Sequence, residues 1–325
     1  MKLFRILTFL FCFMFMTAGF TQNPAAKPAT PQKKSAPAGQ SKPASSDPNK
    51  KALNQYSKET MYAPAANSTK PLTPEQSKAK VLLNEGAKKG KAGDYNGAIA
   101  DFTKSLALAK NVVTYVKRGY AYQMVGNYNA AIDDATEALK LQPGQSRAFF
   151  IRGISHYQKG EFKEAKTDLD QFLEKEKTNA IAYNFRAALC YMEQDYKGAL
   201  NNYDQVAKLD PKYPDIYTNR GMMRHTLQDF KGAIQDYNEA LKLNPDNFSA
   251  YNNRGAANMM LKDFPAALSD FDKAISLNAK YADAFDNRGR VKHVLGDDEG
   301  ACADWQSAYN NGLEASKDLI IKFCK

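Results

Sequence analysis

The sequence contains few of the residues that commonly carry out catalysis or bind metals. Its 325 residues include three histidines, four cysteines and one tryptophan. His156, His225 and His293 lie 69 and 68 residues apart, so no two of them share one face of a helix as metal ligands do. The sequence also has no recognisable nucleophile motif beside a histidine and no glycine-rich phosphate loop. These absences predict a protein that is not an enzyme and that uses no metal and no cofactor.

A hydrophobic run long enough to span a membrane is missing as well. The apolar run over residues 6–16 is well short of the roughly 20 residues that a membrane span needs. Lys2 and Arg5 precede this run, and small residues follow it at positions 17–19 and 21. This order predicts a signal peptide over residues 1–21 and export to the periplasm or cell envelope, or secretion. An uncleaved anchor is the alternative interpretation.

Residues 22–72 have little that would form a hydrophobic core. Nine of the fourteen prolines lie between residues 23 and 75, together with many alanines, serines and lysines. Eight lysines against three carboxylates give the same stretch a net charge of +5. This composition predicts a disordered linker over residues 22–72, with a weak signal for a short helix from Lys50. A basic linker can make weak contact with anionic envelope surfaces, or it can serve only as a spacer.

A repeat with a period of 34 residues, or 33 between the first two units, fills the rest of the chain. A small residue recurs at this spacing, an alanine follows it after twelve residues, and a bulky side chain stands four further on in most units. Read in steps of three and four, these positions fall on two short amphipathic helices whose backbones approach closely. One such hairpin cannot bury its own apolar faces, so the copies are expected to stack. The small residues are Gly86, Gly119, Gly153, Ala187, Gly221, Gly255 and Gly289.

This pattern resembles the tetratricopeptide repeat (TPR) family over roughly residues 79–315. The resemblance implies an all-α fold, a right-handed α-solenoid of about seven helix-turn-helix repeats that acts in protein-protein interaction. The solenoid is expected over residues 73–315, starting at a capping box on Thr73, with a C-terminal capping helix over residues 313–325. The repeats are expected near residues 79–111, 112–145, 146–179, 180–213, 214–247, 248–281 and 282–315.

Six repeats place an arginine directly before the small residue, and five of them have an aspartate sixteen residues after that arginine. One helix hairpin brings these two positions close together, so each arginine is expected to pair with the aspartate of its own repeat. Arg186 breaks the rule, because Asn202 stands in the aspartate's place. A basic ladder for acidic ligands is the alternative. The expected structural pairs are Arg118–Asp134, Arg152–Asp168, Arg220–Asp236, Arg254–Asp270 and Arg288–Asp304.

The concave face, lined by the first helix of each repeat, is the surface that the family resemblance assigns to ligands. Aromatic and methionine side chains there suit adaptable apolar contacts with a peptide. Asparagines at the sixth position of three consecutive repeats are similar to the ladder that binds peptide backbone in superhelical sugar-transferase repeats. Packing between repeats is the alternative for all of these residues. The expected peptide-binding residues are Tyr120, Tyr157, Asn184, Tyr191, Met192, Asn219, Met222, Asn252, Asn253, Met259 and Asn287.

Two cysteines flank the turn expected near the C-terminus. Cys302 lies ten residues before Gly312 and Cys324 twelve after it, so antiparallel helices around that turn bring the two cysteines level. In an oxidising compartment this placement favours a disulfide that joins the capping helix to the last repeat. Two reduced thiols are the alternative. Cys190 falls on a core position of its repeat.

Together these features predict a non-catalytic interaction scaffold of the bacterial cell envelope, binding an extended peptide or a partner helix on its concave face. The expected partner is therefore a protein or peptide, and no small-molecule cofactor is expected. The alternative function is association with the cell wall or membrane surface through the basic linker. Outside the signal peptide and linker the net charge is only about +3, so nucleic acid is not an expected partner.

Overall fold

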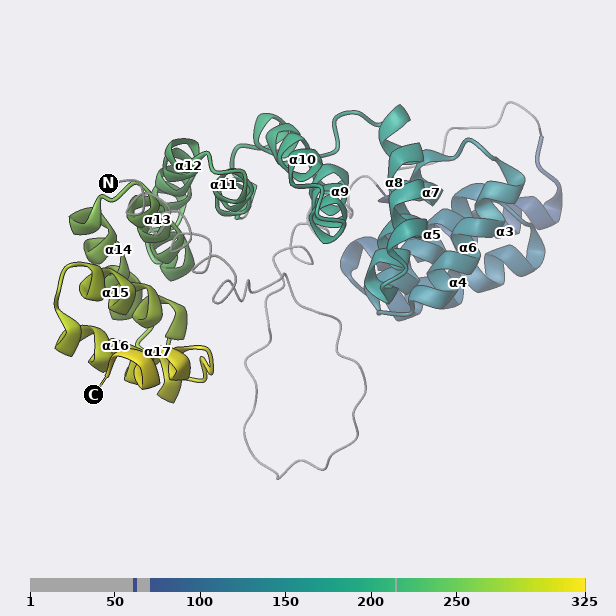
Figure 1. Cartoon of the computed structure of the whole chain (residues 1–325). Coiled ribbons are helices and arrows are strands. Elements are labelled where there is room, and N and C mark those ends of the chain that lie inside the picture. Colours follow the sequence, from purple (N-terminus) through teal and green to yellow (C-terminus); the bar gives the residue numbers. More distant parts are fainter. Residues whose placement is uncertain (1–60, 63–70, 214, 325) are drawn as a thin grey trace, which may run out of the picture. The chain divides into compact units, whose positions relative to one another are not determined.

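The computed structural model describes residues 61–62, 71–213 and 215–324. Within these ranges all regular secondary structure is α-helical, in fifteen helices labelled α3 to α17 (Figure 1). The predicted all-α solenoid is therefore confirmed. The predicted signal peptide and most of the predicted linker lie outside the described residues. None of the described helices combines the length and the hydropathy that a membrane crossing requires.

The helices fall into two compact units, which divide between Ile216 and Tyr217. In the first unit consecutive helices pair as hairpins: α3 (Pro74–Ala92) with α4 (Tyr95–Leu108), α5 (Val112–Met124) with α6 (Tyr128–Leu141), α7 (Ser146–Lys159) with α8 (Phe162–Lys175), and α9 (Ala180–Met192) with α10 (Tyr196–Leu209). The second unit contains α11 (Ile216–Thr226), α12 (Phe230–Leu243), α13 (Phe248–Met260), α14 (Phe264–Leu277), α15 (Ala282–Val294), α16 (Asp298–Asn310) and α17 (Ser316–Phe323).

Each hairpin closes around the small residues of the repeat. The seven alanines twelve residues after the small position are fully buried, and the large side chains four residues further on are buried beside them. At Gly255 a Cβ atom would lie 2.8 Å from Cε1 of Phe271, so a larger residue would displace that ring. Close backbone approach at the small position therefore makes room for the ring that fills the hairpin.

The turn inside each hairpin uses the same two positions of the repeat. A residue with positive φ comes first, and the side chain of the next residue caps the second helix in every repeat except the third, where Glu161 makes no such hydrogen bond. Gly93 precedes Asp94 in the first repeat, whereas Gln194, Gln228 and Lys262 take this conformation in repeats four to six with φ between 62° and 65°. Asp263 accepts a hydrogen bond from the backbone N–H of Ala266 and thereby caps α14. Thr73 and Gln76 form the predicted capping box of α3.

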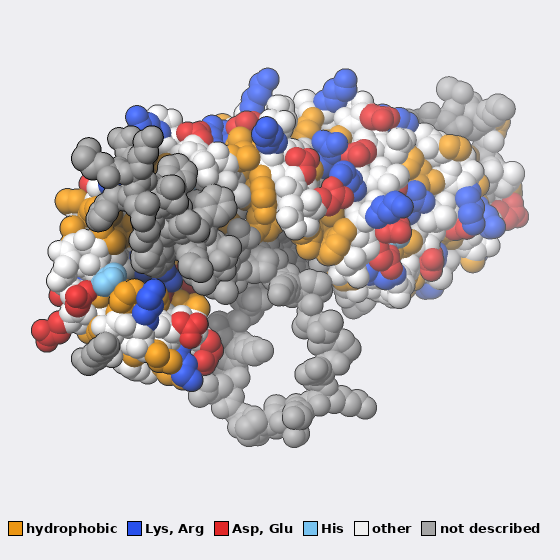
Figure 2. Space-filling view, viewed as in Figure 1, with side chains coloured by type: hydrophobic (Ala, Val, Ile, Leu, Met, Phe, Trp, Pro, Cys, Tyr) orange, Lys and Arg blue, Asp and Glu red, His pale blue; other side chains and the backbone are white. Residues whose placement is uncertain are grey.

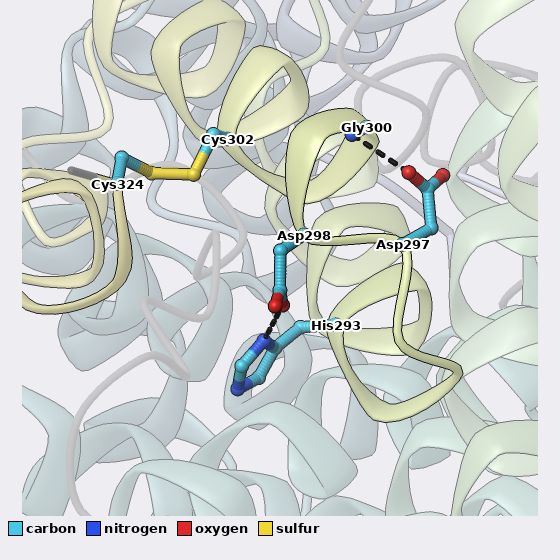
Figure 3. The surroundings of a disulfide bond; sticks show 6 residues. All are labelled: His293, Asp297, Asp298, Gly300, Cys302 and Cys324. Atoms are coloured by element: carbon cyan, nitrogen blue, oxygen red, sulfur yellow. Dashed lines mark hydrogen bonds and ion pairs between the residues drawn. A yellow bond between two sulfur atoms is a disulfide. The ribbon is translucent and has the colours of Figure 1, made fainter.

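The C-terminal helix α17 spans Ser316–Phe323, fewer residues than the 313–325 that were predicted. It packs on α16, where the Phe323 ring centroid lies 5.7 Å from that of Trp305. A disulfide joins Cys302 in α16 to Cys324, with the two Cα atoms 5.6 Å apart. The predicted pairing of these cysteines is therefore present, and Figure 3 shows it bridging the two chain segments.

Two residues of the predicted linker do not behave as linker residues. Met61 and Tyr62 are 4% and 7% exposed, and they belong to the first unit. Tyr62 packs on α3, α4 and α5, where its ring contacts the rings of Phe102 and Tyr120. The composition of the surrounding stretch gave no sign of this packing.

Candidate functional site

The five predicted arginine–aspartate pairs are all present. In each pair a guanidinium nitrogen lies 2.5 to 2.7 Å from a carboxylate oxygen, and the aspartate side chain is at most 7% exposed. Arg118 donates from both Nε and Nη2 to the two carboxylate oxygens of Asp134, and Arg152 does the same to Asp168. These hydrogen bonds raise the pKa of both guanidinium groups above its ordinary value. Two parallel hydrogen bonds fix the orientation of each arginine.

The arginines also contact the preceding repeat, which the sequence analysis missed. Arg186, which has no aspartate in its own repeat, pairs with Asp170 on α8 at 2.5 Å and also donates to Asn202. Nη1 of Arg254 donates to Asn238 on α12 at 2.6 Å, in addition to the pair with Asp270. The signal was in the sequence, because Asp170 and Asn238 each stand sixteen residues before their arginine. The arginines thus join neighbouring repeats and do not form a free basic ladder.

Three of the predicted peptide-binding residues are buried. Asn184 and Asn252 are each 5% exposed and Tyr120 is fully buried. Asn184 and Asn252 therefore have almost no surface that a ligand could reach from solvent, and peptide binding by them stays a prediction. Tyr120 lies beneath the ring of Tyr62, which covers it.

The two buried asparagine positions differ from the sixth-position asparagines beside them. Asn219, Asn253 and Asn287 are partly exposed on α11, α13 and α15. Nδ2 of Asn287 donates to Oδ1 of Asn252 at 3.0 Å, across one repeat. An asparagine network therefore already links neighbouring first helices in the second unit.

The remaining predicted residues lie partly exposed along the first helices. Met192 is 44% exposed, and Tyr157, Tyr191, Met222 and Met259 are intermediate. Two of them also stabilise the repeat. Tyr157 packs against Phe162 and, at 5.0 Å between ring centroids, against Phe185 of the next repeat, and Tyr191 lies 6.0 Å from Tyr196. Met192 and Met222 are therefore better candidates for ligand contact than Tyr157.

Lys117 on α5 is a buried charge that the sequence analysis did not single out. It is 3% exposed, and its Nζ donates to the backbone carbonyl of Met61 at 2.8 Å. Burial, together with the nearby charge of Arg147, lowers the pKa of Lys117 to about 8. The same ammonium lies 5.5 Å from the centroid of the Tyr62 ring. The segment Met61–Tyr62 of the chain itself is thus held against α3, α4 and α5.

Sequence comparisons identify the repeats. A family described as TPR repeat matches residues 187–228 and 223–262, and one described as tetratricopeptide repeat matches residues 116–165. Residues 116–165 and 187–262 are therefore tetratricopeptide repeats, which supports a TPR-family protein. The comparison with curated proteins found no match.

Solved TPR proteins have a similar fold. YrrB, described as a TPR protein with an unusual peptide-binding site, is 20% identical with a TM-score of 0.54, over 56% of this chain and 95% of that one. A TPR protein from Parabacteroides merdae is 18% identical with a TM-score of 0.51, over 76% and 97%. PilF of Pseudomonas aeruginosa is 17% identical with a TM-score of 0.53, over 65% and 97%. At these identities the likeness shows the fold alone.

The TPR fold supports a protein-interaction scaffold, and proteins of the TPR family are generally non-catalytic. Within the described ranges, no group of three or more histidine, cysteine or carboxylate residues is arranged to hold a metal. His156 pairs with Glu161 at 2.6 Å, and His293 pairs with Asp298 at 2.5 Å (Figure 3). On the face drawn in Figure 2, basic and acidic side chains are interspersed. The described residues on that face therefore form no continuous basic area of the kind that binds nucleic acid.

Proposed function

We propose that each unit binds an extended peptide of a partner protein along the face formed by its first helices. That face comprises α5, α7 and α9 in the first unit and α11, α13 and α15 in the second. The observation that carries this proposal is the pair Met192 and Met260, at the same repeat position, which are 44% and 40% exposed. Exposed methionines suit apolar contact with varied side chains, because the thioether chain is flexible and polarisable.

Polar groups on the same face can bind the peptide's main chain. Asn219 and Asn253 are partly exposed, and each amide offers both a donor and an acceptor. The arginines of the second unit's first helices are not available in this way, since carboxylates within and between repeats hold Arg220, Arg254 and Arg288. Recognition by apolar side chains and amides is therefore favoured over recognition of acidic groups. The peptide-binding site named for YrrB shows that the fold can host such a function.

Site-specific photo-cross-linking in intact cells tests the proposal. Benzoylphenylalanine replaces Met192 in the first unit or Met260 in the second. The matched controls are Leu141 on α6 and Leu243 on α12, which are 49% and 50% exposed on second helices. We expect cross-links from position 192 and from position 260 to peptide segments of the same partner, and none to it from the controls. Equal capture from the second-helix positions would show that the first-helix face is not the binding surface.

We further propose that the scaffold works in the bacterial cell envelope. Residues 1–21 have the order of a signal peptide, and the Cys302–Cys324 disulfide suits an oxidising compartment. Cell fractionation with sequencing of the mature N-terminus tests this location. A chain found in the cytoplasm with residues 1–21 intact would refute it.

A deletion distinguishes the proposed peptide binding from the competing function, which is attachment to the cell wall or membrane through the basic linker. Removing residues 23–56 deletes six of the eight lysines and leaves Met61 and Tyr62 in place. If the first-helix face is the functional part, the cross-links from positions 192 and 260 persist in the deletion variant. If those cross-links and the envelope association are both lost, the linker is the functional part.

A further inference from the structure

The first repeat lacks a side chain at a position where every other repeat has one. Gly90 stands four residues after the small position of repeat one. The equivalent residues of the later repeats are Gln123, Tyr157, Tyr191, His225, Met259 and His293. A glycine inside a helix costs stability relative to alanine, so its presence in the buried part of α3 calls for a packing reason.

The ring of Tyr62 occupies the space that Gly90 leaves. A Cβ atom on Gly90 would lie 2.3 Å from Cζ of Tyr62 and 2.4 Å from its hydroxyl oxygen. The ring stacks on Phe102 with centroids 6.5 Å apart and 14° between planes, and meets Tyr120 edge-on at 5.7 Å. Aromatic pairs in both geometries are favourable. We call the site formed by Gly90, Phe102, Lys117 and Tyr120 the Tyr62 pocket.

Lys117 adds recognition of the main chain. It is the only lysine at its repeat position, where the other six repeats have asparagine, isoleucine or phenylalanine. Its ammonium donates to the carbonyl of Met61 and lies beside the Tyr62 ring. The pocket therefore binds a backbone carbonyl and the aromatic side chain of the residue that follows it. A peptide has both of these groups, whereas a small anion or a sugar does not.

We propose that the Tyr62 pocket is a binding site for a tyrosine-bearing peptide and that Met61–Tyr62 is its exchangeable intramolecular occupant. The segment holds the pocket closed until a partner peptide with an apolar residue followed by tyrosine takes its place. This inference rests on the proposed peptide-binding function of the first-helix face and names the ligand class at its first repeats.

The docked segment is not optimised for permanent binding. The Tyr62 hydroxyl is buried without a hydrogen-bond partner among the described residues, which weakens the docked state. Lys117 is likewise a charge taken out of water, and it regains its hydration when the segment leaves. Because Met61–Tyr62 is covalently linked to the pocket, a competing ligand can bind only while this segment is displaced. The apparent affinity of that ligand is its intrinsic affinity multiplied by the fraction of time that the pocket is empty.

A binding experiment on the full chain tests the proposal. The probe is a fluorescent synthetic peptide of residues 57–66, SKETMYAPAA. We expect it to bind the Tyr62→Ala variant at least tenfold more tightly than the unaltered chain, because the variant's pocket is empty. The same peptide with its tyrosine replaced by alanine serves as the control ligand. Adding Gly90→Leu to the Tyr62→Ala variant fills the pocket with a good helix former, and binding should be lost.

Equal binding to the unaltered chain and the Tyr62→Ala variant, or binding that survives Gly90→Leu, would overturn the proposal.

Should Tyr62→Ala unfold the chain, two measurements on folded protein still decide. Tyr62→Phe keeps the ring and removes the unpaired hydroxyl, so residue 62 should occupy the pocket more stably. The peptide should therefore bind the Tyr62→Phe variant more weakly than it binds the unaltered chain. A peptide with benzoylphenylalanine at the tyrosine position should label α3 or α5 of the unaltered chain, and labelling elsewhere or nowhere would contradict the site. Cross-linking from positions 192 and 260 is unaffected by either result, so the two proposals fail independently.

Discussion

Arg186 forms its ion pair with Asp170, a residue of the preceding repeat that lies sixteen positions earlier, at a distance of 2.5 Å. The aspartate that the other repeats supply from within is replaced here by Asn202. The pairing across repeats compensates for this loss and uses a contact that Arg288 also makes, to Asp272. The arginines therefore contribute to the stacking of hairpins as well as to their closure.

The two partners of Arg288 should differ strongly in their contribution to stability. Asp304 is 5% exposed and Asp272 is 60% exposed. Asp304→Ala leaves a mostly buried arginine without its bidentate partner, and we expect a loss of about 3 kcal/mol in the free energy of unfolding. Asp272→Ala should cost less than about 1 kcal/mol. Urea denaturation followed by circular dichroism measures both, and equal losses would contradict the interpretation.

Replacing Lys262 by glycine should stabilise the second unit. Lys262 has φ of 63°, a conformation that is unfavourable for a residue with a Cβ atom. We expect a gain of about 0.5–1 kcal/mol in the unfolding free energy, because the relief of strain exceeds the added chain entropy. Gly296 is the matched control. It has φ of 87° and no atom within 4 Å of a Cβ, so Gly296→Ala should destabilise through the backbone alone. A destabilising Lys262→Gly would show that its side chain matters more than its φ.

The Cys302–Cys324 disulfide should hold α17 on the last repeat. The two cysteines are separated by 22 residues, and removing a bridge of this loop size typically costs about 2–4 kcal/mol. In a Cys302→Ser, Cys324→Ser variant, release of Phe323 from Trp305 should change the emission of the chain's one tryptophan. Fluorescence and hydrogen exchange of residues 316–323 report the change. Unaltered emission and exchange would mean that packing alone holds the helix.

Lys117 should make the stability of the first unit depend on pH. Its pKa is about 8 in the folded chain against an ordinary value of 10.5, so the unfolded chain binds more protons between these values. Stability should therefore rise with pH through this window, by about 1–2 kcal/mol between pH 7 and 9.5, because the penalty of burying the ammonium is relieved.

Urea midpoints of the unaltered chain and of Lys117→Met, measured at several pH values, isolate this contribution. The rise should be absent in Lys117→Met. It should be smaller in Tyr62→Ala, where the lysine regains contact with water. A rise of the same size in all three chains would assign it to another group.

The repeat pattern alone was enough to derive the hairpins and several of their contacts. The alternation of Gly255, Ala267 and Phe271 specifies two helices that approach closely, and each of the five predicted pairs of arginine and aspartate lies within one hairpin. Cys302 and Cys324 likewise flank a single turn. Helix geometry converts such short separations into distances with little ambiguity.

Burial on the first-helix face was harder to derive. The sequence placed Asn184 and Asn252 on the same surface as Asn219 and Asn253, yet the former pair is buried and the latter partly exposed. Which of two neighbouring positions on a first helix is buried depends on the angle at which the next repeat packs against that helix. The spacing of the repeats in the sequence does not give this angle.

The sequence by itself determined the repeat register, the helix caps and the contacts inside each hairpin, because these depend on side chains a few turns apart. Only the tertiary structure decided which repeats Arg186 joins and where Tyr62 lies. Tyr62 lies 28 positions before Gly90 and ahead of the first repeat, so no periodicity connects the two residues. Their contact depends on the shape of a space between α3, α4 and α5, which exists only once the first repeats have stacked.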